Sequence, residues 1–479
     1  MALRKLDDYI QDIHDSEPGP KTVAFFDFDK TLIAGYSAKA FLMAQLRSGD
    51  MSMNDMRKQM SAIAKYSSGR LDFSGLIAAT ADTVRGQAEY VFEELGERVF
   101  EKKIAGAIYP EARALLDAHR AMDHTIAIVS SATKYQIEPA ARELDIEYIL
   151  CTDLEVVDGV FTGKALSPTC FGPGKLYAGE DFCDDMETSL DSAFFYTDSE
   201  DDLPLLEAVG HPRVVNPSKK MASIARKRSY PVCRFEGGER PTLGRIARMG
   251  SVYGLMPTSM AVTAPLWPLA GDKRTALNAG VSIWTNLASA IAGLKFDIEG
   301  EENLWSHRPA VFIFNHQSAV DTVIVAKLVQ RDFTAIAKKE IASFPIIGQA
   351  FKYSDVILID RKNSAKAIEQ LRPVVSAIRD DELSVCLAPE GTRSVGRKLG
   401  PFKKGAFHIA MQAGVPIVPI VIHNAGDALP KGQHIAKPAN IKVTVLEPID
   451  TSDWSVRGLN QHVKDVRQLF LDTLGQVEA

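Results

Sequence analysis

The 479-residue sequence has few cysteines and no excess of basic charge. Its five cysteines include no C-x-x-C pair and are odd in number, so we expect neither a disulfide framework nor a zinc site. A net charge of −6 argues against a nucleic-acid partner, for which a basic domain would be expected. Charged residues interrupt the first apolar stretch, so we expect no signal peptide. These absences favour a protein of the reducing cytoplasm.

The sequence contains enough residues for two or three folded domains of about 100 to 200 residues each. Apolar runs alternate with helical patterns in residues 21–235 and again from about residue 297, which predicts two α/β units with largely parallel sheets. In the first unit we expect strands at Thr22–Phe26, Thr125–Val129, Tyr148–Thr152 and Ala193–Tyr196. In the second we expect strands at Ala310–Phe314, Phe333–Ala337, Val356–Ile359, Ser384–Leu387, Pro416–Ile422 and Ile441–Leu446, and then a helix within Ser455–Leu474.

A mostly helical segment at about 37–107 separates the first two expected strands. Open α/β sheets place their sites at the carboxyl ends of the strands, so this insertion is expected to cap such a site. The predicted boundaries are 18–235 for the capped first domain, 236–296 for a basic linker and a helical hairpin, and 297–479 for the last domain.

The segment between the two units has an unusual charge pattern. Residues 219–248 carry nine Lys or Arg against two Glu, and two uncharged runs follow at 249–271 and 276–294. The first run is long enough to span a bilayer, but its three prolines would break a straight helix, and the second run is amphipathic. We predict a hairpin lying in one leaflet, with the basic segment against anionic headgroups. The alternative is a pair of ordinary core helices packed on the last domain.

Carboxylates follow two apolar runs of the first unit. Asp27 comes directly after one of them and is suited to attack phosphorus, while Asp29 can protonate the leaving oxygen and then activate water. An incoming phosphate also needs its charge neutralised, for which Mg²⁺ and further carboxylates, such as those of Asp198–Asp202, are suited. Ser130 and Lys175 can donate to phosphate oxygens.

This set resembles the haloacid dehalogenase superfamily, in particular its phosphoserine phosphatase-like branch, over residues 20–235. The resemblance implies Asp27 as nucleophile, Asp29 as acid and base, phosphate binding by Thr31, Ser130 and Lys175, and Mg²⁺ at Asp27, Asp29, Asp198 and Asp202. It suggests a small phosphomonoester substrate such as phosphoserine. Methionines crowd the expected cap, however, and their adaptable side chains leave a lipid phosphate open as the substrate.

A second motif, Asn315-His316-Gln317-Ser318-Ala319-Val320-Asp321, follows the apolar run 311–314. If a helix begins just after His316, Asp321 can turn back to the imidazole and orient it as a base. No Ser or Cys stands in a nucleophile elbow, which favours direct attack by a substrate hydroxyl. Arg361 and the Pro389–Ser394 segment each follow an apolar strand pattern, and arginine suits a phosphate-bearing acceptor.

These elements, with Phe344–Gly348 and Val415–Pro419, resemble the glycerolipid acyltransferase family, the lysophosphatidate acyltransferases, over residues 297–455. The resemblance implies catalysis by His316 and Asp321 and acceptor binding by Arg361, Glu390, Gly391, Thr392 and Arg393. It also implies acyl-CoA or acyl carrier protein as donor, 1-acylglycerol 3-phosphate as acceptor, and membrane association.

The whole chain looks like the fused phosphatase and acyltransferase proteins of some bacteria. The predicted fold class is α/β: a Rossmann-like haloacid dehalogenase domain with a helical cap, a membrane-associated hairpin and an α/β acyltransferase domain. We expect a bifunctional enzyme, peripheral or monotopic on the cytoplasmic face of the cell membrane, with a homodimer left open. Two alternatives stand: the first domain is a regulatory or dimerising module, or it acts on the lipid phosphate and yields diacylglycerol.

Overall fold

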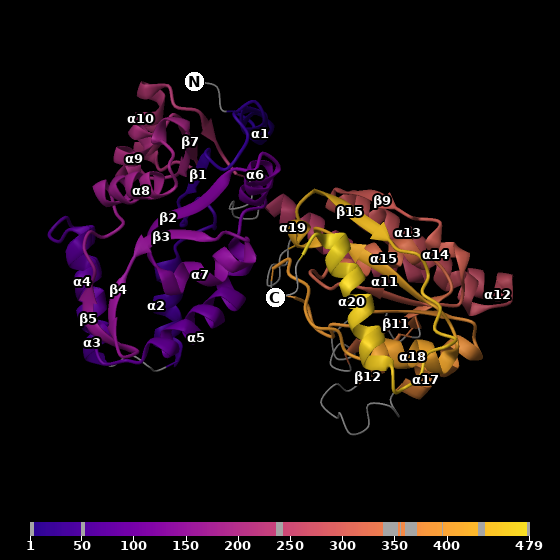
Figure 1. Ribbon diagram of the computed structural model, residues 1–479. Coiled ribbons are helices and arrows are strands. Elements are labelled where there is room, and N and C mark those ends of the chain that lie inside the picture. The colour runs from indigo at the N-terminus through magenta and orange to yellow at the C-terminus, as the bar shows by residue number, and fades with distance from the viewer. Residues whose placement is uncertain are drawn as a thin grey trace. The chain divides into compact units, whose positions relative to one another are not determined.

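The computed structural model describes residues 4–48, 53–235, 243–338, 353–354, 356–359, 371–394, 396–429 and 436–476. The chain forms two compact units that divide between Arg240 and Pro241 (Figure 1). Each unit is described by itself.

The first unit is built on a six-stranded parallel sheet of order β3-β2-β1-β6-β7-β8. Its strands are β1 (Val23–Phe26), β2 (Thr125–Thr133), β3 (Tyr148–Thr152), β6 (Phe194–Thr197), β7 (His211–Val215) and β8 (Val232–Cys233). The central strands β1 and β6 are buried along their whole length, as expected of a parallel sheet covered on both faces. The chain leaves β1 for β2 on one side and later places β6 on the other, so a crevice opens at the carboxyl end of β1.

Helices cover both faces of this sheet. They are α1 (Leu6–His14), α6 (Pro110–Ala121), α7 (Lys134–Glu143), α8 (Pro173–Asp185), α9 (Leu203–Ala208) and α10 (Lys219–Arg228), with short 3-10 turns at Leu190–Ser192 and Glu200–Asp202. Phe182 of α8, Leu205 of α9 and Met221 of α10 pack with Phe25 of β1 in one buried cluster. This cluster holds the three helices against β1.

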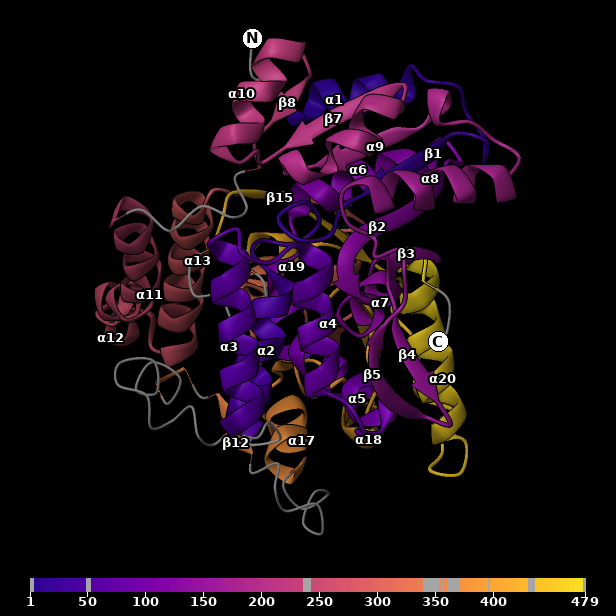
Figure 2. The same cartoon turned by 90° about the vertical axis from the view of Figure 1, so that its left-hand side faces the viewer.

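The residues between β1 and α6 form a helical cap. It comprises α2 (Ser37–Ser48), α3 (Met53–Ser67), α4 (Phe73–Thr83) and α5 (Glu89–Val99), followed by a π-helical turn (Phe100–Ile104) and a 3-10 turn (Ala105–Ala107). The hairpin of β4 (Leu154–Val157) and β5 (Val160–Ala165) joins it through a bridge between Ala88 and Val160 (Figure 2). The sequence pattern did not indicate this hairpin.

The second unit is built on a seven-stranded sheet of order β12-β11-β13-β10-β14-β15-β9. Its strands are β9 (Leu294–Glu299), β10 (Val311–Phe314), β11 (Phe333–Lys338), β12 (Ile357–Ile359), β13 (Ser384–Leu387), β14 (Ile417–Ile422) and β15 (Ala439–Val445). All neighbours are parallel except β14 and β15. The helices are α14 (Asn303–Ser306), α15 (Asp321–Val329), α17 (Arg372–Arg379), α18 (Gly405–Ala413), α19 (Ala425–Ala428) and α20 (Leu459–Leu474).

The uncharged runs form a helical hairpin within the second unit. It consists of α11 (Leu243–Thr263), α12 (Leu266–Ala270) and α13 (Lys273–Ala292), with α11 and α13 side by side (Figure 2). Met249 and Ala288 belong to the same buried cluster as Phe312 of β10, so one face of the hairpin packs on the domain as ordinary core helices would. Its tip is different, because Leu269 is 82% and Val262 67% exposed. Among the described helices, none has both the length and the apolar character needed to cross a membrane.

A buried pair of histidines, His119 and His124, packs against the sheet of the first unit. His119 Nδ1 lies 2.8 Å from His124 Nδ1, and His119 Nε2 lies 2.9 Å from the hydroxyl of Tyr196. Burial lowers the pKa of His119 well below its usual value, and the neighbouring His124, Arg213 and His211 lower it further. Burial also lowers the pKa of His124. Both rings are therefore neutral in the folded protein at neutral pH.

We therefore predict that the first unit loses stability as the pH falls below about 6.5, the ordinary histidine pKa. Below this pH the histidines become protonated in the unfolded chain but not in the folded core. The free energy of unfolding therefore falls by up to about 1.4 kcal/mol per pH unit for each such histidine. Urea unfolding at pH 7.5 and 5.5 measures this loss. His119→Gln keeps a hydrogen-bonding side chain that does not titrate, and it should flatten the dependence. An equal loss in that variant would contradict the assignment.

Candidate active sites

The first site lies at the carboxyl end of β1. Asp27 follows the last strand residue, and its N–H donates to the Tyr196 carbonyl at 3.0 Å, so the β1–β6 pairing positions it. The residue is 6% exposed at the base of the crevice. Burial raises the pKa of Asp27 to about 8, despite the opposing effect of Lys175. The site therefore favours an added positive charge.

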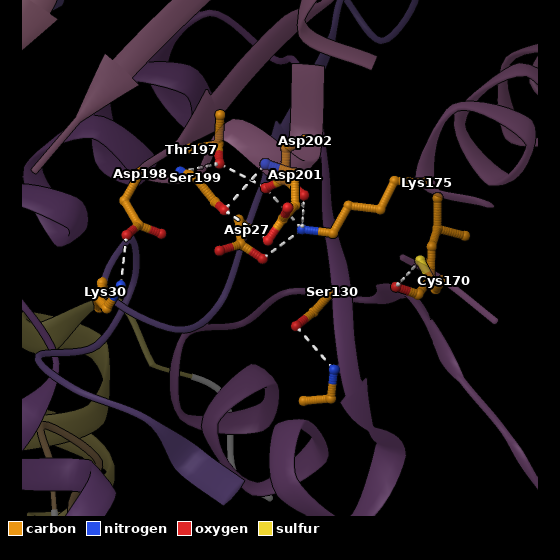
Figure 3. A network of polar contacts seen from close by, with 12 residues as sticks. Asp27, Lys30, Ser130, Cys170, Lys175, Thr197, Asp198, Ser199, Asp201 and Asp202 are labelled. Carbon is orange, nitrogen blue, oxygen red and sulfur yellow. Dashed lines mark hydrogen bonds and ion pairs between the residues drawn. The ribbon is translucent and has the colours of Figure 1, made fainter. Parts of the chain in front are cut away.

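Lys175 joins the carboxylates (Figure 3). Its Nζ donates to Asp27 at 2.7 Å and to Asp202 at 2.9 Å, and it is almost completely buried. Burial alone would lower the pKa of Lys175, but Asp202 and Asp27 raise it above the ordinary value, so it stays charged. Asp202 also accepts from the Thr197 hydroxyl at 2.5 Å. This network holds the ammonium beside Asp27.

The other expected residues surround Asp27 at different depths. Asp29 accepts from the N–H of Ser37 at 2.8 Å, and burial raises its pKa to about 6. A carboxyl group with that pKa can both donate and accept a proton near neutral pH. The Thr31 hydroxyl is buried and has no hydrogen-bond partner among the residues that the structure describes. Ser130, at the end of the regular part of β2, is 2% exposed, and its oxygen accepts from the N–H of Ala132 at 3.3 Å.

The fit of this site to a metal ion follows from its charges. Among the described residues, no three His, Cys, Asp or Glu side chains are arranged as a metal-binding group. Asp198 instead accepts from Lys30 Nζ at 2.9 Å. Asp27, Asp198 and Asp202 nevertheless set three buried carboxylates against the two ammonium groups of Lys30 and Lys175. This excess of hard oxygen donors is the chemistry that Mg²⁺ prefers. Metal binding by Asp27, Asp29, Asp198 and Asp202 stays a prediction.

The second site lies at the carboxyl end of β10. Asn315 fixes this end: its amide donates to the Ile422 carbonyl at 2.8 Å and accepts from the Ile422 N–H at 2.7 Å. These bonds tie the turn after β10 to the end of β14. His316 follows, with its ring edge-on to Phe314 at 5.9 Å between centroids. The Asn315 bonds thus fix the main chain before His316, and Phe314 of the sheet contacts its ring.

Asp321 is the first residue of α15 and turns back to His316. Its Oδ2 accepts from His316 Nδ1 at 2.8 Å and from the N–H groups of Gln317 and Ser318 at 2.8 Å each. Its side chain is fully buried. A histidine whose Nδ1 donates to a carboxylate presents an unprotonated Nε2, as a general base requires. The arrangement can therefore take a proton from a bound hydroxyl.

Glu390 supports this turn from the neighbouring strand. One of its carboxylate oxygens accepts from the N–H of His316 at 2.7 Å, and the other accepts from the N–H of Gly400 at 2.9 Å. Burial raises the pKa of Glu390, although these two N–H groups oppose the shift. The contacts of Glu390 thus lie within the protein, and its binding of an acceptor stays a prediction.

The loop after β13 brings further groups toward His316. The N–H of Ser394 donates to the His316 carbonyl at 2.7 Å, which places the neighbouring Thr392 and Arg393 on the same side. Gly391 has a φ of +75°, and a Cβ there would come within 2.9 Å of Lys403 Nζ. The left-handed backbone conformation favours glycine here, whereas the flexible Lys403 side chain could move away from a Cβ. Arg361 and the Phe344–Gly348 element lie outside the described residues.

Sequence reasoning assigned no role to Lys30, Lys403 or Gln317, and it expected Glu390 to bind the acceptor rather than to hold the turn. Lys30 stands inside the first motif, and its basic side chain directly after Asp29 was the available signal. The positioning role of Glu390 had no signal, because it depends on main-chain donors far away in sequence. Lys403 beside Gly391 had none either. Gln317 is 3% exposed, and its side-chain amide has no hydrogen-bond partner within the described part of the chain.

Comparisons with known proteins divide the chain in the same way. Residues 24–207 match the family model of haloacid dehalogenase-like hydrolases. Residues 295–423 match the acyltransferase family model. A solved structure of a phosphoserine phosphatase phospho-aspartyl intermediate analogue covers 46% of this chain and 95% of its own, at 16% identity and a TM-score of 0.35.

Two curated relatives match the second unit. The 1-acyl-sn-glycerol-3-phosphate acyltransferase of Limnanthes alba is 35% identical over 41% of this chain, and the chain spans only 66% of that relative's length. The 1-acyl-sn-glycerol-3-phosphate acyltransferase of Escherichia coli is 34% identical over 37% of this chain and 72% of its own length. The chain therefore belongs to the acyltransferase family, with a haloacid dehalogenase-like hydrolase domain fused ahead of the acyltransferase domain.

Proposed function

We propose that this chain is a bifunctional enzyme that acylates 1-acylglycerol 3-phosphate to phosphatidate and hydrolyses a phosphomonoester through an aspartyl-phosphate. The observation that carries the proposal is the presence of two sites in two different folded units: the Asp27–Lys175–Asp202 network and the His316–Asp321 pair. The family models support the two reaction types. The names of the relatives support the acyl acceptor.

In the acyl transfer, His316 Nε2 removes the proton from the acceptor hydroxyl as that oxygen attacks the thioester carbonyl. Asp321 stabilises the imidazolium that forms, and the sulfur of the donor then leaves and takes the proton. The thioester is that of acyl-CoA or acyl carrier protein. Arg393 stands in the loop whose Ser394 N–H donates to the His316 carbonyl, and its guanidinium group suits the acceptor phosphate because it can bind phosphate in a bidentate way.

In the phosphatase, an Asp27 oxygen attacks phosphorus while Asp29 protonates the leaving oxygen. Asp29 then removes a proton from the water that hydrolyses the aspartyl-phosphate. Lys175, Ser130 and Thr31 donate to the phosphate oxygens, and the Thr31 hydroxyl is suited to this because it has no hydrogen-bond partner among the described residues. The residues that would hold Mg²⁺ are Asp27, Asp29, Asp198 and Asp202, and the ion would supply positive charge to neutralise the phosphate.

Mass spectrometry of products tests the proposal. The protein is incubated with 1-acylglycerol 3-phosphate, acyl-CoA and Mg²⁺, and separately with phosphomonoesters. We expect phosphatidate in the first mixture and inorganic phosphate in the second. Diacylglycerol in the first mixture would place the lipid phosphate among the phosphatase substrates. Chelation should stop phosphate release only, since the His316 chemistry needs no metal.

We further propose that the protein acts at the cytoplasmic membrane surface through the hairpin tip. Trp267 and Leu269 are large, exposed apolar residues of the short helix α12, and water-exposed apolar groups of this size favour burial in the headgroup and acyl boundary. The basic residues of 219–248 supply attraction to anionic lipid, at about 1 kcal/mol each near the surface. The inner face of the hairpin stays on the domain core.

Flotation with anionic liposomes is expected to show two components of this binding. High salt should release part of the protein, and replacing Trp267 and Leu269 with serine should weaken the salt-resistant part by at least about tenfold, given roughly 1.5–3 kcal/mol for burying one large apolar side chain. Val456→Ser removes an equally exposed apolar residue outside the hairpin and serves as the control. Equal flotation of the hairpin variant and the control would contradict the tip as the anchor.

A further inference from the structure

Four aromatic residues stand around the phosphatase site, and we call them the aromatic rim. They are Tyr36 after β1, Tyr66 of α3, Phe73 at the start of α4 and Phe171 in the loop before α8. Two come from the cap, one from the connection that leads to it and one from the core. None of the four is fully buried, and Tyr36 is 57% exposed. Their exposed apolar surface is not needed to fill the core of the unit.

The aromatic rim is connected to the catalytic groups by short contacts. Lys30 Nζ lies 4.4 Å from the centre of the Tyr36 ring and 2.9 Å from Asp198. Tyr36 itself precedes Ser37, whose N–H holds Asp29. Phe171 directly precedes Gly172, the residue at the start of the helix that carries Lys175. Substrate atoms attached to a phosphate beside Asp27 would therefore meet these rings next.

The cap contributes the other two residues of the aromatic rim, Tyr66 and Phe73. The Phe73 ring is stacked on the Phe171 ring, with 4.2 Å between centroids and 13° between planes, and Tyr66 meets Phe73 edge-on at 6.3 Å. The Ser74 and Thr169 hydroxyls lie 3.4 Å apart beside this stack. Partial burial raises the pKa of Tyr66, and the charges of Asp201 and Tyr36 add to the shift. Tyr66 thus lies near both the acidic segment after β6 and Tyr36.

The chemistry of these groups points to an apolar occupant. Phe73 and Phe171 carry no charge and offer no hydrogen bond, so they provide nothing for the carboxylate and ammonium groups of an amino-acid phosphate. An aromatic cage for a quaternary ammonium needs free ring faces. Here Phe73 and Phe171 turn faces toward each other, and Lys30 stands over Tyr36. Hydrocarbon, by contrast, gains from contact with ring edges and faces alike.

We infer that the phosphatase substrate is a phosphomonoester whose leaving group is apolar, held against the aromatic rim, rather than phosphoserine or phosphocholine. This inference rests on the proposed phosphatase activity and names its substrate class. A lipid phosphate and a small alkyl or aryl phosphate share the required chemistry, and the experiment below separates them.

The test is a series of n-alkyl phosphates from ethyl to hexyl, which differ little in leaving-group reactivity. Each methylene buried against the rim should raise kcat/KM by up to about fourfold. For the full-length protein we therefore expect kcat/KM to rise at least about tenfold from ethyl to hexyl phosphate. Phosphoserine and phosphocholine should be poorer substrates than hexyl phosphate. Lysophosphatidate is added as a further substrate. If it exceeds hexyl phosphate the substrate is a lipid, and if it does not the substrate is a small soluble ester.

Variants locate the effect. Tyr66→Ser and Phe73→Ser should each reduce the rise across the series by severalfold, whereas Phe73→Leu should keep most of it. Tyr90→Ser removes a 62% exposed cap aromatic outside the rim and should change nothing. Binding of ethyl and hexyl phosphonate to Asp27→Asn by calorimetry gives a second readout that needs no turnover.

A flat series with measurable ethyl phosphate hydrolysis, or a preference for phosphoserine or phosphocholine, would overturn the inference and leave the phosphatase activity intact. Absence of phosphate release from every ester would remove the proposed activity and the inference with it.

Discussion

Asp27→Asn is expected to lower phosphate release by at least about 10³-fold while leaving acyl transfer within twofold of the wild type. Asparagine has nearly the same shape as aspartate, so the bond to the Tyr196 carbonyl and the packing of β1 persist. What is lost is the anionic oxygen that attacks phosphorus. Lys175 keeps Asp202 as its partner, so the ammonium stays buried with a counter-charge.

Phosphate release from an alkyl phosphate and acyl transfer to 1-acylglycerol 3-phosphate are measured in the same preparation. Asp181→Asn changes an exposed carboxylate on α8, the helix that carries Lys175, and should leave both rates unchanged. Phosphate release that survives in Asp27→Asn would exclude Asp27 as the nucleophile.

His316→Ala is expected to have the second largest effect, a loss of about 10² to 10⁴ in the rate of acyl transfer. Without the imidazole, no group takes the proton from the acceptor hydroxyl, and Asp321 keeps only the N–H groups of Gln317 and Ser318 as partners. The main-chain bonds from His316 to Glu390 and Ser394 do not involve the ring, so the loop should keep its shape.

Thiol release from acyl-CoA gives the rate, and phosphate release from an alkyl phosphate should remain unchanged in the same protein. His307→Ala removes an exposed histidine of the same unit and serves as the control. If His307→Ala and His316→Ala lost equal amounts of activity, the decrease would reflect general damage rather than loss of a base.

Much of the sheet architecture could be predicted from the sequence, because buried parallel strands carry unbroken apolar runs. The pattern at Ser384–Leu387 predicted β13 with its observed ends, and Val311–Phe314 was expected within one residue. The edge strand β12 was also expected within one residue, whereas the two-residue edge strand β8 was not predicted, because so short a strand gives too weak a pattern. The β4–β5 hairpin was missed for a related reason, since β4 has only four residues and none of them is buried.

The catalytic motifs were predictable where the chemistry is local in sequence. His316 and Asp321 lie five residues apart, and the short turn that leads into α15 brings them together. Bonds such as Glu390 to the His316 N–H span 74 residues and depend on which strands become neighbours, which a single sequence does not encode in any local pattern. The hairpin shows a further limit. An amphipathic stripe indicates that the apolar face of a helix is covered, but it does not tell whether protein or lipid covers that face.

The most direct test of two independent sites in one chain is to record phosphate release and thiol release from one sample of the double variant Asp27→Asn, His316→Ala, beside each single variant. The account predicts that each single variant loses one activity, and that the double variant loses both by the same factors as the single variants while keeping the wild-type circular dichroism spectrum. If either single substitution removed both activities from a folded protein, the two sites would not be independent and the account would be wrong.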